Sequence, residues 1–189
     1  GTNLVLTLDA FSNVAMNVTN SSGTGVGRIY PKNVGPSDNN YDSFTNLTTI
    51  TSRNYVAGSK SVAIVFNSEA IGTSANIQMS YDNVGYAQLA DGTVTTIGAR
   101  VSISDMVYRP SDWQDVNADK GKMAMDFSTN FYSGMQLTNV RKFNWNVTFF
   151  EVKSSKAINF QKDTAAMLTF TSLNPGEFVK PESTNLTFS

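Results

Sequence analysis

Apolar and polar residues alternate along most of this chain, and this alternation restricts the fold more than any other feature of the sequence. Two segments show it clearly, namely Leu4, Leu6 and Leu8, and then Val14, Met16 and Val18. Successive side chains of a β-strand point to opposite faces, so each segment offers one apolar face to a core. No window of useful length carries the 3.6-residue period of an amphipathic helix. The sequence therefore predicts an all-β protein.

Further strands are expected along the rest of the chain. The run 61–66 is apolar on both faces and rich in β-branched residues, which is typical of a central strand. Asp91-Gly92 predicts a hairpin with a type I′ turn, because that turn needs a positive φ at both central residues. The hairpin would join strands 86–90 and 93–97, and the remaining predicted strands are 100–108, 122–127, 142–153 and 166–172.

These short strands, separated by turn signals, predict a two-sheet β-sandwich of lectin-like or jelly-roll type. Phe143, Trp145, Val147 and Phe149 share one face of the long strand 142–153, so Trp145 is expected in the core. Residues 1–189 show no internal repeat and no sharp change of composition, so a single domain is predicted. Loops are expected at 21–27, 31–43, 109–121 and 174–176.

The composition excludes several classes of function. The chain has no His and no Cys, so a Ser-His-Asp triad, a thiolate nucleophile and a zinc site of the usual ligands are excluded. Its four Glu residues do not pair on one strand, and we expect no enzyme activity. A net charge of -1 argues against nucleic acid as a partner. The longest apolar run, 62–66, is far too short for membrane insertion.

Binding residues are expected on the two longest polar connections, 31–43 and 109–121, because long loops on a rigid β-scaffold tend to carry function. Trp113 lies in a polar segment where no alternation would direct it into the core, and an exposed Trp suits stacking on a sugar or anchoring a protein. A Trp that folds back over the sandwich is the alternative. The predicted ligand-binding residues are Trp113, Asp112, Asp115, Asn39, Asn40 and Tyr41.

A weak calcium pattern overlaps the second of these loops. Asp115, Asn117 and Asp119 are spaced by two, and Asp126 follows eleven residues after Asp115. Oxygen ligands at such positions can converge on one calcium ion. However, Lys120 stands where a calcium loop needs Gly, and the last ligand is Asp in place of Glu. A solvated acidic loop is the favoured interpretation of these residues, so no metal and no cofactor are predicted, and calcium is kept as the alternative.

Three stretches and the opening of the chain resemble a known family. The stretches are YDNVGYAQLADGTVTTIGARVSISDMVYR, MAMDFSTNFYSGMQLTNVRKFNWNVTFFE and LTFTSLNPGEFV, and the opening is GTNLVLTLDAF. Together they resemble the non-repetitive, lectin-like ligand-binding domain of the CshA-type fibrillar adhesins of oral streptococci. The resemblance implies an extracellular domain, excised from a cell-wall-anchored bacterial surface protein, that binds a host matrix glycoprotein such as fibronectin in colonisation and co-aggregation.

Other functions stay open. A glycan-binding lectin module would use an aromatic platform at Trp113 with amide neighbours such as Asn117. A structural stalk or capsid sandwich would explain the neutral polar surface without any ligand. An adhesin can also add a disordered partner as a strand to an exposed sheet edge, in which case loop side chains would matter little.

Overall fold

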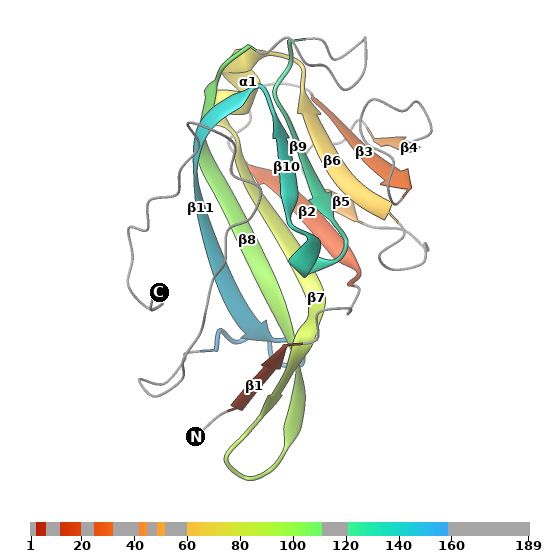
Figure 1. Ribbon diagram of the computed structural model, residues 1–189, viewed down its shortest axis with the longest axis vertical. Helices are drawn as coiled ribbons and strands as arrows, with labels where there is room; N and C mark the ends of the chain where they lie inside the picture. Colours follow the sequence, from red (N-terminus) through yellow and green to blue (C-terminus); the bar gives the residue numbers. More distant parts are fainter. Residues whose placement is uncertain are drawn as a thin grey trace.

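The computed structural model describes residues 3–6, 12–19, 25–31, 42–44, 49–51, 60–110 and 121–158. These residues form two antiparallel sheets packed face to face, and the prediction of an all-β two-sheet sandwich is confirmed (Figure 1). The predicted strand 166–172 and the predicted turn 174–176 lie outside the described residues.

The larger sheet has six strands. Its order is β11-β8-β7-β2-β5. Strand β2 pairs with residues 76–81 of β7, and β1 pairs with residues 85–88 of the same strand. Its strands are β1 (Asn3–Leu6), β2 (Val14–Thr19), β5 (Thr49–Thr51), β7 (Asn76–Gln88), β8 (Val94–Tyr108) and β11 (Val140–Glu151).

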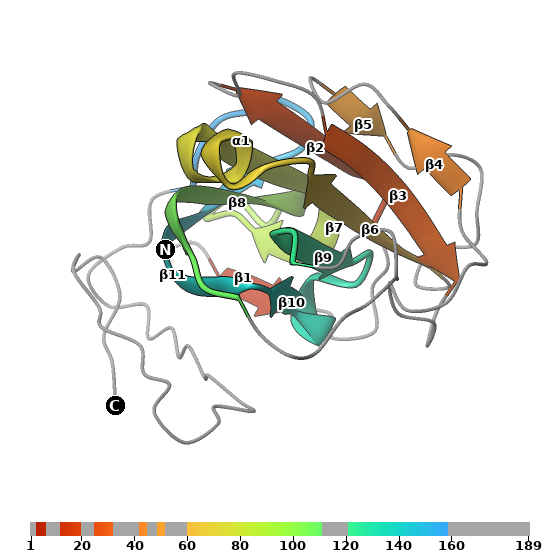
Figure 2. The same cartoon turned by 90° about the horizontal axis from the view of Figure 1, so that it is seen from above.

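The smaller sheet has five strands, in the order β10-β9-β6-β3-β4. They are β3 (Gly25–Pro31), β4 (Asp42–Phe44), β6 (Lys60–Phe66), β9 (Ala124–Ser128) and β10 (Met135–Thr138). A helix of six residues, α1 (Glu69–Ser74), links β6 to β7 and lies at one end of the molecule (Figure 1), so that it faces the viewer when the molecule is seen from above (Figure 2). The Ser68 side chain caps this helix by accepting a hydrogen bond from the Ile71 amide.

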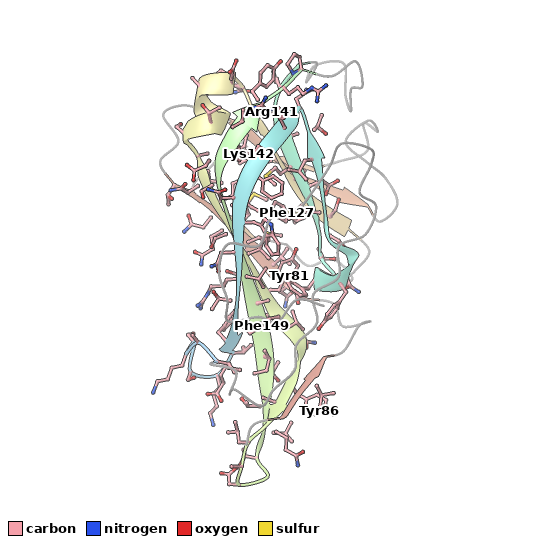
Figure 3. All side chains as sticks on the ribbon, turned by 60° about the vertical axis from the view of Figure 1, so that its left-hand side comes forward. Tyr81, Tyr86, Phe127, Arg141, Lys142 and Phe149 are labelled. Carbon is pink, nitrogen blue, oxygen red and sulfur yellow. The ribbon has the colours of Figure 1, made fainter. Side chains whose placement is uncertain are left out.

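The core lies between the sheets and follows the predicted alternation. Val14, Met16 and Val18 on β2 are buried, and the intervening Asn17 is exposed. All five residues from 62 to 66 are buried, because β6 is the middle strand of its sheet. Tyr81 and Phe127 are among the largest fully buried side chains, and they point between the sheets together with Phe149 (Figure 3). The Tyr81 hydroxyl donates a hydrogen bond to the Ser128 carbonyl at 3.0 Å, which joins the two sheets.

The face of β11 predicted to carry Trp145 into the core does pack against it. Phe143, Trp145, Val147 and Phe149 are partly buried and contact the core cluster. They remain partly exposed because β11 is the outermost strand of its sheet among the described residues. An edge strand receives cover from only one neighbour within its own sheet, so its inward side chains are less enclosed than those of β7 or β8.

The hairpin at Asp91-Gly92 is confirmed, but the predicted turn type is wrong. Gly92 has a φ of 85°, whereas Asp91 is not among the residues with a positive φ. The Leu89 carbonyl accepts from the Gly92 amide at 2.9 Å, and the Leu89 amide donates to the Thr93 carbonyl at 2.8 Å. The loop therefore has three residues, and only the third, Gly92, adopts the left-handed conformation. Gly92 is thus the one position of the loop that favours glycine.

Several strand boundaries differ from the prediction. The glycine-rich segment predicted as the loop 21–27 contains the start of β3, and Gly25 and Gly27 pair with Phe66 and Ile64 of β6. The predicted strands 93–97 and 100–108 form one continuous strand, β8, and β7 extends back to Asn76. Strands β4, β5 and β10 were not predicted, because each has only three or four residues and too little sequence to establish a period.

Candidate functional site

The sequence-predicted binding residues fall in two segments outside the described residues. Asn39, Asn40 and Tyr41 belong to the segment 32–41, and Asp112, Trp113, Asp115, Asn117 and Asp119 belong to the segment 111–120. Their roles stay predictions. The structure does describe how the segment 111–120 is attached at each end.

Asn139 connects both ends of the segment 111–120. Its carbonyl accepts a hydrogen bond from the Arg109 amide at 3.0 Å, and its side-chain Nδ2 donates to the Lys122 carbonyl at 2.8 Å. Asn139 is buried and has a φ of 56°, a conformation that Asn tolerates better than most residues. The chain that leaves β8 and the chain that enters β9 are therefore held close together, and no sequence pattern predicted this role for Asn139.

The last member of the calcium pattern lies in a strand. Asp126 is half-buried on β9, where it pairs with Ala63 of β6 and with Gln136 of β10. The other three members of the pattern, Asp115, Asn117 and Asp119, lie outside the described residues, so the calcium site stays a prediction. Within the described ranges, no group of three or more carboxylate side chains could hold a metal ion.

Three of the four exposed large hydrophobic side chains in the described part of the molecule lie together at one end. The ends of β7 and β8 continue beyond the sandwich, pair with β1, and project as a three-stranded extension at one end of the molecule (Figure 1). We call this region, formed by 3–6 and 85–97, the distal hairpin. It includes the first residues of β8 and lies at the opposite end of that strand from Tyr108.

Three side chains of the distal hairpin form an exposed apolar row. Val5 pairs with Tyr86, Tyr86 pairs with Thr96, and Val94 lies two residues from Thr96 on the same face. Val5 is 39% exposed, Tyr86 40% and Val94 59%. In the described part of the chain, only Val107 among the other large hydrophobic residues is comparably exposed, at 36%. The apolar exposure is therefore concentrated on this hairpin (Figure 3 labels Tyr86).

Hydrogen bonds stiffen the turn and the base of the distal hairpin. Bonds from Thr93 hold the pKa of the exposed Asp91 below its ordinary value, because they stabilise the ionised carboxylate. At the base, hydroxyls of Ser154 and then of Thr95 lower the pKa of Glu151 in the same way. At each end of the hairpin, hydrogen bonds thus favour the ionised form of one carboxylate.

A β-bulge marks the point where the distal hairpin leaves the sandwich. The register between β7 and β8 shifts between Tyr81 and Gly85. The Ser12 hydroxyl donates to the Asn83 carbonyl at 2.6 Å and accepts from the Asn83 amide at 3.0 Å. Across the same bulge the Tyr132 hydroxyl donates to the Val84 carbonyl. These bonds satisfy the backbone groups that the bulge withdraws from the ladder, so they hold the hairpin at one angle.

The comparisons with known proteins add no family. A scan against protein-family models and searches of curated proteins and of solved structures find no match to this chain. None of the helices in the described part of the chain has the length and apolar character needed to cross a membrane.

Proposed function

We propose that this chain is a non-catalytic, ligand-binding domain of an extracellular, cell-wall-anchored bacterial adhesin, and that it captures a host matrix glycoprotein such as fibronectin. The observation that supports a binding role is the exposed apolar row Val5, Tyr86 and Val94 on a hairpin that projects from the sandwich. The resemblance of the sequence to CshA-type adhesin domains supports the class of partner.

The row has features of a protein contact. Isolated exposed apolar residues are ordinary, but neighbouring ones on a projecting element mark interaction surfaces more often. Tyr86 offers a large rigid ring with a hydroxyl, the combination that dominates binding energy in protein interfaces. The bulge contacts of Ser12 and Tyr132 preorganise the hairpin, which reduces the entropy lost on binding.

The test measures capture of immobilised fibronectin by the wild-type domain and by a variant carrying Val5→Thr, Tyr86→Thr and Val94→Thr. Threonine keeps the strand propensity while removing the apolar surface. We expect capture to weaken more than about tenfold, since removal of one central aromatic contact alone costs about 2 kcal/mol. Val107→Thr is the matched control, because it removes a similar exposed side chain at the other end of β8.

Two results would count against the proposal. Absence of fibronectin binding by the wild-type domain would overturn the choice of partner and favour the lectin or stalk alternatives. Unchanged capture by the hairpin variant, with loss of capture on replacing Trp113, Asp112 and Asp115 by Ala, would move the site to the predicted loop.

A further inference from the structure

The outward face of the six-stranded sheet carries a row of amide and hydroxyl side chains that runs across four strands. Asn146 on β11 pairs with Ser102 on β8, Ser102 with Gln78 on β7, and Gln78 with Asn17 on β2. We call these four residues the amide row. All four side chains are exposed, while the alternate residues on each strand face the core. Adjacent strands lie about 4.8 Å apart, so the row spans roughly 14 Å.

The residue types of the amide row oppose the preference of strands. Asn is depleted in β-strands, yet Asn17 and Asn146 lie within regular paired stretches of β2 and β11, and Asn144 lies two residues before Asn146. These side chains contribute nothing to the core. Positions where local preference is violated in a well-packed fold are those where function is expected.

Most of the polar capacity of the row is directed at solvent. In the part of the chain that the structure describes, no hydrogen bond engages the side chains of Asn17, Gln78 or Ser102. Asn146 uses only Oδ1, which accepts from the Thr148 hydroxyl at 3.2 Å. Each amide thus offers donors and acceptors together. A ligand rich in hydroxyl groups, each of which both donates and accepts, matches this row.

Charge complementarity selects an uncharged ligand. The neighbouring row contains Arg100, whose guanidinium lies 4.1 Å from the centroid of the Phe150 ring that covers Gly98. On the other side, Asp105 accepts hydrogen bonds from Asn144 at 2.9 Å and from Ser104 at 3.5 Å. Arg100 and Asp105 flank the row and are each already engaged, and Lys142 is an exposed cation two residues before Asn144. Among the residues that the structure describes, these two cations lie on opposite sides of the row, so a polyanion would gain little there, whereas a neutral polyol needs no cation.

We propose that the amide row binds an uncharged oligosaccharide laid across the strands, with its hydroxyl groups bonded to Asn17, Gln78, Ser102 and Asn146. This site is separate from the distal hairpin and does not require fibronectin as the partner. Phe150 is buried, so it offers no ring for a sugar to stack on, and each hydrogen bond to the row is weak. Because NMR detects weak binding, the experiment follows the side-chain amide resonances of the row.

The probes are a linear glucose hexasaccharide, a neutral mannose- and N-acetylglucosamine-containing glycan, and a heparin hexasaccharide as the charged comparison. We expect at least one neutral probe to shift the side-chain NH₂ signals of Asn17, Gln78 and Asn146. The affinity should be insensitive to salt, because no ion pair forms. Asn17→Thr and Asn146→Thr should each weaken binding about three- to tenfold, the effect of one lost hydrogen bond.

Threonine makes the test selective, because it favours strands and should leave the melting temperature unchanged or raise it. Gln88→Thr, an exposed position on the distal hairpin, is the matched control and should leave glycan binding unchanged. Three results would overturn the proposal. They are no response to either neutral probe, a salt-sensitive response to heparin alone, or binding that survives both Asn replacements. Loss of fibronectin capture by the hairpin variant with intact glycan binding would separate this site from the proposed function.

Discussion

The same two strands, β7 and β8, sort their side chains differently in the sandwich and in the distal hairpin. In the sandwich, Ile77, Met79 and Ile103 face the second sheet and are buried, while outward positions carry amides and hydroxyls. In the hairpin, Ala87 and Ile97 are still buried, but the outward positions carry the apolar residues Tyr86 and Val94. Burial stabilises the first arrangement, whereas exposure of apolar surface gains nothing for folding. The contrast assigns stability to the sandwich, and its extension is where the proposed recognition site lies.

The largest expected difference between the regions is in stability. Ile103→Ala, which removes a fully buried side chain from the middle of β8, should lower the free energy of unfolding by about 2–5 kcal/mol. Val94→Ala, on the same strand but 59% exposed, should change it by less than about 0.5 kcal/mol. Chemical denaturation of the two variants measures both values. Similar losses would mean that the hairpin row is packed in solution, and the comparison would fail.

The sandwich could be predicted from sequence because its alternation reports directly on burial. The period of Val14, Met16 and Val18, and the wholly apolar run 62–66, each identified a buried surface correctly. The hairpin could not be assigned in the same way, since alternation does not say where along β7 the facing sheet ends. Val94, close to the glycine of the turn, belongs to the exposed row, but the sequence alone does not distinguish an exposed valine from a core valine.

The candidate sites depend on contacts between distant segments. Asn17 and Asn146 belong to one row only because β2, β7, β8 and β11 pair in one register. Sequence can place each of them on the outward face of its own strand, but it does not contain strand order. A usable signal was present in the repeated Asn at 144 and 146, which is unusual inside a strand. The predicted residues Trp113 and Tyr41 lie outside the described part of the chain.

A smaller effect is expected where the two regions join. Ser12→Ala removes both hydrogen bonds to Asn83 at the bulge and leaves backbone groups without those partners. We expect a loss of about 1–3 kcal/mol in the free energy of unfolding, together with faster hydrogen exchange at 85–88. Ser102→Ala, which removes an exposed hydroxyl with no hydrogen bond in the described structure, is the control and should be neutral. Equal effects of the two replacements would show that the bulge does not hold the hairpin.

The smallest effect concerns the alkaline stability of the same junction. Burial raises the pKa of Tyr132 from 10.0 to about 12, and its hydroxyl donates to the Val84 carbonyl at the bulge. Below pH 10 both the folded and the unfolded chain keep this proton, so the contribution of Tyr132 is constant. Between about pH 10 and 12 the unfolded chain releases the proton first, and the free energy of unfolding falls. The fall should be under about 1 kcal/mol, because water screens a phenol that is only partly buried.

Tyr132→Phe loses the hydrogen bond at every pH but should show a flatter profile over this interval. The two proteins differ only by this one hydroxyl, so the difference between the two profiles isolates Tyr132. Parallel profiles would show that the Tyr132 hydroxyl reaches water, and the contact between η2 (Phe131–Ser133) and the bulge would then not form part of the rigid base of the hairpin.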